Sequence, residues 1–231
     1  MTEGAANCPN PMKLIIASNL YNSEINPEHI NSLMDLTVIL NEMQIPYEYW
    51  AGEEKDDAKS KNRVINKFLN TDFTHLLMVK SELSWDIRGV IRLLKAAIKG
   101  AEVIGGTYPM YGNFGAIPEM EDGMVVGYDT NEFRIIKCKQ LAGGFILYNK
   151  TAFDKVETET YIEKNMQDED IHIKEYFKTI SFPGTEDIYF QRKYIEAGGE
   201  ILLEPNITFK FLGKKKWNGN YSQYLLGNPV I

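Results

Sequence analysis

The sequence predicts an α/β fold, with a single domain built on a central mixed, mostly parallel sheet flanked by helices. Two kinds of segment alternate through about residue 105. Short continuous apolar runs, such as KLIIAS (13–18) and HLLMV (75–79), are typical of strands buried on both faces of a parallel sheet. The segments between them carry apolar residues at helical spacing, which completes the pattern of βαβ units. A chain of 231 residues that is 44% hydrophobic can bury a large core.

The first half of the chain is expected to alternate strand and helix. We expect strands at residues 13–18, 47–50, 75–79 and 101–105. We expect helices at residues 27–43, 60–69 and 87–98. Asn26 and Pro27 are good entry signals for the first of these helices, and Gly100 ends the third.

The second half has a different character, with several glycines between short strand-like pieces after Gly106. We expect a strand at 145–148, a helix at 186–197 closed by Gly198 and Gly199, and last strands at 201–203 and 207–211. A polar, acidic stretch runs from residue 157 to 170. One α/β domain over residues 12–231, preceded by a loose leader at 1–11, accounts for the whole chain.

Composition excludes several classes of protein. With 25 Lys and Arg against 32 Asp and Glu, the net charge is −7, which argues against wholesale coating of nucleic acid. Cys8 and Cys138 lie far apart, so we expect a reducing, cytoplasmic location rather than a disulfide scaffold. No apolar run approaches the roughly 18 residues of a membrane span, and the first residues do not resemble a signal peptide.

Candidate site residues follow from the strand order, because ligands of open parallel sheets bind beyond the carboxyl ends of the strands. That rule selects Ser18–Asn19, Lys80–Ser81–Glu82 and the segment 105–108 that ends in Tyr108. Lys80 and Glu82 follow HLLMV directly. The alternative is a solvated strand end, with Ser84 as the cap of the next helix. From position alone both interpretations stay open.

Two further pairs have both a structural and a functional interpretation. Gly143–Gly144 permits close approach to the backbone, by a ligand or by another element of the protein. Glu186–Asp187 begins a helix, where carboxylates complement the helix dipole and Thr185 can serve as a cap. An aspartate held at that position can equally act as a general base.

One dense basic cluster, Lys214 to Lys216, lies near the carboxyl end of the chain. It is either a solvated loop or, in a crevice, a phosphate clamp. The three histidines show no metal-ligand spacing. P-loop, nucleophile-elbow and dinucleotide-binding glycine motifs are absent from the sequence. The residues by themselves thus define an α/β protein with charged groups around a crevice.

Four segments taken in order resemble the compact GT-A-type glycosyltransferases, family 2-like, particularly small ones encoded by phages and large viruses. The segments are SKNRVINKFL with TDFTHLLMV (60–79), SWDIRGVIRLLKA with EVIGGTYP (84–109), LAGGFILYNKTAFDKV (141–156) and TEDIYFQRKYIEAGGEILLEPNITFKFLG (185–213). The likeness runs from Lys13 to about Asn220, nearly the whole chain.

The resemblance implies an inverting transfer of a sugar from a nucleotide donor, with UDP-sugars favoured, to a hydroxyl group. Residues 12–110 would bind the nucleotide sugar and residues 111–231 the acceptor. Asp187, beside Glu186, would deprotonate the attacking hydroxyl. The donor-binding residues would be Ala17, Ser18, Asn19, Asn62, Arg63, Ser81, Glu82 and Lys214. The acceptor-binding residues would be Tyr108, Gly143 and Gly144.

The sequence departs from the family at its metal site. The family's Asp-x-Asp motif falls on Lys80–Ser81–Glu82, and its late histidine ligand falls on Phe211. At most one hard ligand remains, so we expect no tight Mn²⁺ or Mg²⁺ site and no required cofactor. Lys80 would then supply a fixed positive charge near the diphosphate, aided by Lys210 or the 214–216 loop.

Decay of the enzyme into a nucleotide-sugar-binding module without turnover is the competing explanation, and a structural viral protein is a third. For an active enzyme the acceptor would be a glycan or a hydroxymethylated base in viral DNA. DNA requires a positive face and access to a flipped base, and the net charge of −7 counts against it. A viral enzyme would work in the host cytoplasm, and no stable protein partner is implied.

Overall fold

The computed structural model describes residues 11–19, 26–52, 57–110, 113–121, 124–125, 135–165, 167–179, 186–212 and 216–227. Three sequence-based expectations lie outside these residues: the leader apart from Pro11, Thr185 as a helix cap, and Lys214 as a donor-binding residue.

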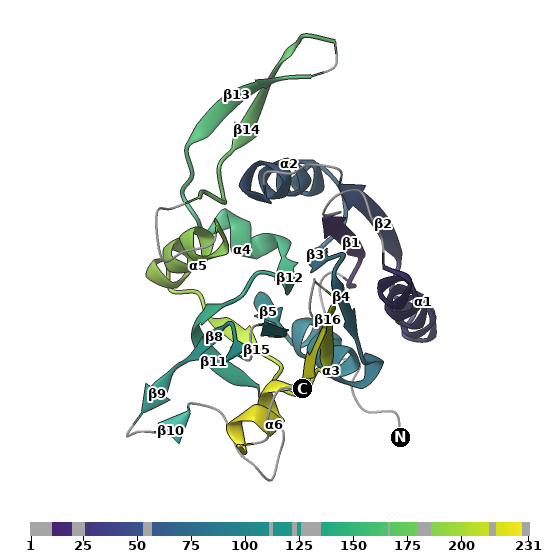
Figure 1. Ribbon diagram of the computed structural model, residues 1–231. Helices are drawn as coiled ribbons and strands as arrows, with labels where there is room; N and C mark the ends of the chain where they lie inside the picture. Colours follow the sequence, from purple (N-terminus) through teal and green to yellow (C-terminus); the bar gives the residue numbers. More distant parts are fainter. Residues whose placement is uncertain are drawn as a thin grey trace, which may run out of the picture.

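An eight-stranded sheet forms the centre of the protein (Figure 1). Its order is β2 (Tyr47–Gly52), β1 (Leu14–Asn19), β3 (His75–Lys80), β12 (Phe145–Asn149), β5 (Val103–Gly105), β15 (Ile201–Leu203), β11 (Ile136–Leu141) and β8 (Ala116–Pro118). Strands β12 and β11 run antiparallel to their neighbours, and the other six strands share one direction. The predicted mixed, mostly parallel sheet is therefore confirmed.

Helices cover both faces of this sheet. They are α1 (Pro27–Glu42), α2 (Asp57–Leu69), α3 (Ile87–Ile98), α4 (Lys150–Asp154), α5 (Glu186–Glu196) and α6 (Tyr221–Leu225). Side chains alternate between the two faces of a strand, so β1 and β3 contribute to two cores. One core packs against α1 and α3 and contains Leu14, Ile16, Leu77 and Val79. The other packs against α2, α4 and α5 and contains Ile15, Ala17, Leu76 and Met78.

The predicted helices and strands of the first half are confirmed, with small shifts of their ends. Asn26 caps α1, because its side chain accepts a hydrogen bond from the backbone N–H of Glu28 at 2.8 Å. The helix predicted from residue 60 begins at Asp57. No helix in the described part of the chain is long and apolar enough to cross a membrane.

The expected Ser84 cap is wrong. Ser84 lies in a short strand, β4 (Leu83–Trp85), which pairs with β16 (Phe209–Leu212). The helix cap is Asp86, whose carboxylate accepts hydrogen bonds from the backbone N–H groups of Arg88 and Gly89 at 3.0 and 3.4 Å. An aspartate immediately before the helix is the better acceptor for these groups.

Smaller ribbons complete the fold. β16 also pairs with β17 (Lys216–Gly219), and short pairs form between β6 (Pro109–Met110) and β7 (Asn113–Phe114) and between β9 (Met120–Glu121) and β10 (Met124–Val125). The polar stretch at 157–170 continues into a hairpin of β13 (Thr160–Lys164) and β14 (Asp170–Lys174). This hairpin extends away from the central sheet (Figure 1).

Gly89 provides a test of the packing between α3 and the segment before β16. A Cβ atom at this position would lie 2.6 Å from Cγ1 and 2.7 Å from Cα of Ile207. Replacing glycine by alanine inside a helix normally raises stability by about 1 kcal/mol. Here we expect Gly89→Ala to lower the free energy of unfolding by about 1–3 kcal/mol, as overpacking does.

Urea unfolding of the wild type and Gly89→Ala measures this difference, with Lys95→Ala on the exposed side of α3 as the control. A higher free energy of unfolding for Gly89→Ala would contradict the close contact.

Candidate functional site

The carboxyl ends of β1 and β3 and the start of β12 meet at one edge of the sheet. The register pairs Asn19, at the end of β1, with Lys80, at the end of β3. The backbone N–H of Lys80 donates a hydrogen bond to the carbonyl oxygen of Gly144 at 2.9 Å. The topology therefore brings three of the predicted segments together, as expected for the ligand edge of an open sheet.

Gly143 and Gly144 leave room for side chains from other elements. A Cβ atom at Gly143 would lie 1.8 Å from Cγ and from Oδ2 of Asp187. One at Gly144 would lie 2.1 Å from Cε1 of Tyr108. The sequence left open whether a ligand or another element of the protein approaches this pair of glycines. In the structure, side chains from other elements do so. The two glycines bring Asp187 and Tyr108 against the start of β12.

A buried ion-pair cluster holds the first two residues of α5. Nζ of Lys61 lies 2.5 Å from Oε1 of Glu186 and 2.7 Å from Oδ1 of Asp187. The exposed fractions of the three side chains are 2% for Lys61, 11% for Glu186 and 3% for Asp187. Two carboxylates thus share one ammonium group in a site that is shielded from water.

This geometry has electrostatic consequences for Glu186. Burial raises the pKa of Glu186 above its ordinary value, the Lys61 ammonium lowers it, and the Asp187 carboxylate raises it. Desolvation disfavours a charged carboxylate, and a like charge beside it does the same. Lys61 is therefore the main influence that keeps Glu186 ionised.

Lys61 was not among the residues selected from the sequence. It lies in α2, on the face that carries the buried residues Ala58, Ile65 and Phe68. Positions 58, 61, 65 and 68 follow the spacing of a single helix face. That spacing is the signal that could have identified Lys61, because a lysine on an apolar face needs a partner when it is buried.

Tyr108 forms the aromatic wall of the site. Its ring stacks on Phe211, with ring centroids 5.8 Å apart and an angle of 14° between the planes. Burial raises the pKa of Tyr108; the ammonium groups of Lys80 and Lys61 lower it, and the carboxylates of Asp187 and Glu82 raise it. Charged groups from three different segments therefore act on one buried tyrosine.

Not all of the predicted donor-binding residues point to this cluster. The side-chain amide of Asn62 forms two hydrogen bonds of 2.8 Å with the backbone of Phe177. Nε of Arg63 lies 2.5 Å from Oε2 of Glu163, on the β13–β14 hairpin. In this structure Asn62 thus holds the segment at Phe177, and Arg63 holds the β13–β14 hairpin.

The residues at the end of β1 are well packed. Ala17 and Ser18 are 2% and 1% exposed. The Ser18 hydroxyl lies 3.2 Å from Nε2 of His29, whose Nδ1 lies 2.7 Å from the carbonyl oxygen of Leu83. Burial lowers the pKa of His29, which favours the neutral ring.

Ser81 and Glu82 lie in the turn between β3 and β4. Ser81 is 2% exposed, and its hydroxyl lies 3.5 Å from Oε2 of Glu82. The backbone carbonyl of Glu82 accepts a hydrogen bond from the N–H of Leu212 at 2.8 Å, which ties the turn to β16.

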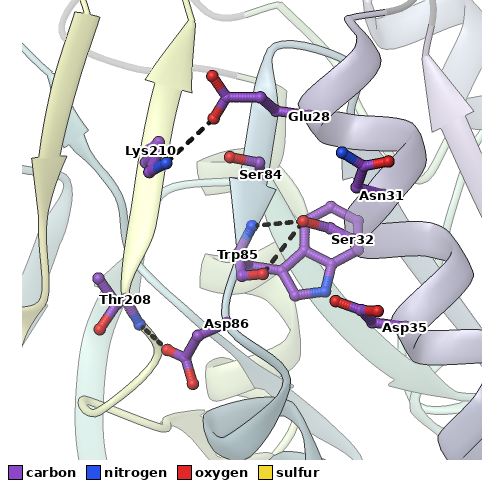
Figure 2. A pocket seen from close by; sticks show the side chains of 9 residues that line it. All are labelled: Glu28, Asn31, Ser32, Asp35, Ser84, Trp85, Asp86, Thr208 and Lys210. Atoms are coloured by element: carbon purple, nitrogen blue, oxygen red, sulfur yellow. Dashed lines mark hydrogen bonds and ion pairs between the residues drawn. The ribbon is translucent and has the colours of Figure 1, made fainter.

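Lys210 turns away from the cluster. Figure 2 shows it beside Glu28 of α1, with Nζ and Oε2 3.2 Å apart. Both residues line a cavity of about 380 Å³ between α1, β4 and β16, together with Asn31, Ser32, Asp35, Ser84, Trp85, Asp86 and Thr208. Apart from Lys210 itself, none of the predicted site residues lines this cavity, and the Lys210 ammonium is paired with Glu28 rather than placed beside Lys80.

The residues present do not fit a divalent metal ion. The described part of the chain contains no group of three or more His, Cys, Asp or Glu side chains that could hold one. At the Lys80–Ser81–Glu82 turn only Glu82 offers a carboxylate, and Phe211 packs its ring on Tyr108. Hard cations need several oxygen ligands, which this set lacks.

Comparisons with known proteins give a fold and no family. No protein-family model and no curated protein matches the sequence. Among solved structures the chain is similar to A197 from STIV, with a TM-score of 0.56 and 10% identity over 90% of this chain and 89% of that chain. At this identity the likeness is one of fold alone.

Two glycosyltransferase structures also match, at TM-scores below 0.5, and carry no functional argument. Drosophila β1,4-galactosyltransferase 7, in complex with manganese, UDP-Gal and xylobiose, matches with a TM-score of 0.48 and 13% identity over 84% of this chain and 66% of that chain. GalNAc-T7 with UDP, GalNAc and Mn²⁺ matches with a TM-score of 0.49 and 11% identity over 87% of this chain and 44% of that chain.

The contact between Gly143 and Asp187 provides a test of the site. Gly143→Ala should lower the free energy of unfolding by about 1–3 kcal/mol, because the new methyl group displaces a buried carboxylate. The same substitution should cost much less in an Asp187→Ala background, where the carboxylate is absent. A double-mutant cycle by urea unfolding measures the coupling. Strictly additive costs would show that the two groups do not compete for this space.

Proposed function

We propose that the chain is a glycosyltransferase, which moves a sugar from a nucleotide-sugar donor to a hydroxyl acceptor. The observation that carries the proposal is the position of Asp187. Its carboxylate lies against Gly143 at the ligand edge of the sheet and is held by Lys61. This is the position at which the sequence resembles the family's catalytic base, and the α/β fold supports the same assignment.

The donor would bind along the carboxyl ends of β1 and β3. We assign the nucleotide base to the Ala17–Asn19 end of β1, and the diphosphate to the turn that contains Lys80, Ser81 and Glu82. Arg63 would reach the donor only by leaving Glu163, to which it is paired at 2.5 Å. Asn62 would act through the backbone of Phe177, and Lys214 would contribute from the residues that follow β16 in the sequence. A UDP-sugar is the donor that we favour.

The reaction would be a single displacement with inversion. Asp187 takes the proton from the acceptor hydroxyl, and the oxygen attacks the anomeric carbon. The bond from that carbon to the diphosphate oxygen breaks on the opposite face, and its electron pair leaves with the nucleoside diphosphate. A fixed ammonium group at Lys80 would offset the negative charge that develops on the leaving group. No metal ion is needed in this scheme, in keeping with the single carboxylate at the turn.

Tyr108, Gly143 and Gly144 would border the acceptor. Tyr108 follows β5, and Gly143 and Gly144 precede β12. Gly143 lies against Asp187, and Gly144 against Tyr108. The acceptor class that we propose is a glycan or a hydroxymethylated base in viral DNA. Salt-dependent binding of DNA to the protein would favour the hydroxymethylated base as acceptor, because counterion release accompanies phosphate contacts.

A second candidate function is a nucleotide-sugar-binding module without turnover. The observation in its favour is that the Asp187 side chain is 3% exposed and already paired with Lys61, which restricts the access of an acceptor hydroxyl to this carboxylate. Turnover separates the two candidates, because a binding module retains affinity for the donor without consuming it.

Release of nucleotide from a panel of UDP-, GDP-, CMP- and dTDP-sugars tests the catalytic proposal. We expect one donor to be consumed, and Asp187→Asn to reduce this rate about 100-fold or more, because the amide keeps the shape of the side chain but cannot accept the proton. Thermal-shift binding of the same donors is the control for the intact site. Donor binding without turnover in the wild type would establish the binding module instead.

Chelation tests the proposed role of Lys80. Turnover should persist in EDTA, and Lys80→Ala should lower it about 100-fold or more, as the loss of one preorganised charge does. Added Mn²⁺ should not restore the variant. Lys139→Ala, an exposed lysine on β11, is the matched control and should keep the wild-type rate. A wild type that loses activity in EDTA and regains it with Mn²⁺ would refute metal independence.

A further inference from the structure

The Lys61 cluster carries an unbalanced charge in a buried place. Two carboxylates and one ammonium sum to −1, and all three side chains are at least 89% buried. Uptake of one proton would make the cluster neutral, which desolvation favours. Removal of the ammonium would leave −2 in the same place. The lysine therefore decides whether the pair can be ionised.

Lys61 also fixes the geometry of Asp187. Its Nζ contacts Oδ1 at 2.7 Å, and the same carboxylate lies against Gly143, whose Cβ position is 1.8 Å from Oδ2 and 2.1 Å from Oδ1. The ammonium on one side and the Gly143 backbone on the other thus confine the Asp187 carboxylate. A carboxylate held in this way has a fixed place beside the proposed acceptor site.

The helix that carries Lys61 is itself tied to the segment before α5. Asn62, the next residue, forms two hydrogen bonds of 2.8 Å with the backbone of Phe177. The Phe177 ring lies 5.6 Å from Nζ of Lys61. The position of the ammonium is therefore set by packing on several sides, which a solvated lysine would lack.

We propose that Lys61 is the positioning residue of the Glu186–Asp187 pair: it holds the Asp187 carboxylate against Gly143 and keeps the pair able to take up one proton. This role rests on the proposed transferase function. The proton taken from the acceptor hydroxyl stays on the pair, so the buried cluster passes from −1 to neutral during the displacement. Lys61 itself contacts neither donor nor acceptor in this scheme.

The charged and titratable groups around the pair come from several elements. Lys61 reaches it from α2, and Lys80 and Glu82, at the end of β3 and in the turn after it, act on the neighbouring Tyr108. Tyr108 and Tyr148 complete the set; burial raises the pKa of each, and the Asp187 carboxylate raises it further. Both phenols therefore stay protonated, and Glu186, whose pKa is raised by burial, is the carboxyl group that the response to pH involves.

The direction of the pH response follows from these charges. Burial raises the pKa of Glu186 above its ordinary 4.5, and Lys61 opposes this. Without the ammonium the pair holds a proton at higher pH, by about 1–3 units, which is the usual influence of an adjacent opposite charge. The stability of a Lys61→Met variant should therefore improve as the pH falls from the raised pKa of the folded pair toward 4.5. Within this pH range the folded form binds the extra proton and the unfolded chain does not.

The test compares Lys61→Met with Lys61→Arg and with Lys59→Met, an exposed lysine on the same helix. The first readout is a ¹³C NMR titration of the side-chain carboxyl carbons, which needs no turnover. We expect Lys61→Met to move the titration of the Glu186–Asp187 pair upward by about one unit or more. Lys61→Arg should move it little, since it keeps the charge, and Lys59→Met should leave it unchanged.

The second readout is the pH profile of nucleotide release. In Lys61→Met the acidic limb of kcat should move to higher pH in parallel with the NMR titration, with little change in the donor KM. Lys61→Met with Glu186→Gln should bring the limb back down, because the second carboxylate charge is gone; this double variant also covers the case in which Lys61→Met does not fold.

The outcomes of the two readouts are separable. An unchanged carboxyl titration in Lys61→Met, or in the double variant relative to Glu186→Gln alone, overturns the role of Lys61 whether or not the protein turns over. A shifted titration in a protein without turnover supports the proton-sharing pair and rejects the transferase function on which its purpose rests. A raised donor KM with an unmoved pH profile would assign Lys61 to donor binding and contradict the proposal.

Discussion

The ion-pair cluster of Lys61 with Glu186 and Asp187 joins the two halves of the chain at the ligand edge of the sheet. Lys61 comes from α2, in the first half, and the carboxylates begin α5, in the second. Charges buried this deeply are tolerated only when they are paired and well placed. Gly143 completes the arrangement because it has no side chain where the Asp187 carboxylate lies. The position of the proposed base thus depends on contacts from three separate segments.

Much of the fold could be predicted because its central strands are buried on both faces. A strand such as β3 must then be apolar throughout, and HLLMV is visible without any structure. The ligand edge followed from the same prediction, since the ends of parallel strands lie side by side. The β13–β14 hairpin was missed because this stretch was interpreted only as polar and acidic, although the residues of β14 (DIHIK, 170–174) alternate between polar and apolar. β4 was missed because it has only three residues, and its Ser84 resembles a helix cap.

The most informative residue of the site was also missed. A lysine is read as a solvated residue by default, and three of the five residues from Lys59 to Arg63 carry a positive charge. The structure separates them: Lys61 is buried, and Arg63 is paired with the hairpin. Partners at least 100 positions away in the sequence decide these roles, which no local pattern contains. By contrast, the departure from the metal motif of the family that the sequence resembles was visible directly, since Lys80 and Phe211 stand where that family has residue types that bind metals.

The central claim is that this charged edge binds a nucleotide sugar without a metal ion. Isothermal titration calorimetry of the wild type with UDP, GDP, CMP and dTDP in EDTA tests it most directly. We predict saturable binding of one nucleotide in EDTA, with an affinity that Mn²⁺ leaves unchanged. Binding that appears only when Mn²⁺ is added, or no binding of any nucleotide under either condition, would contradict it.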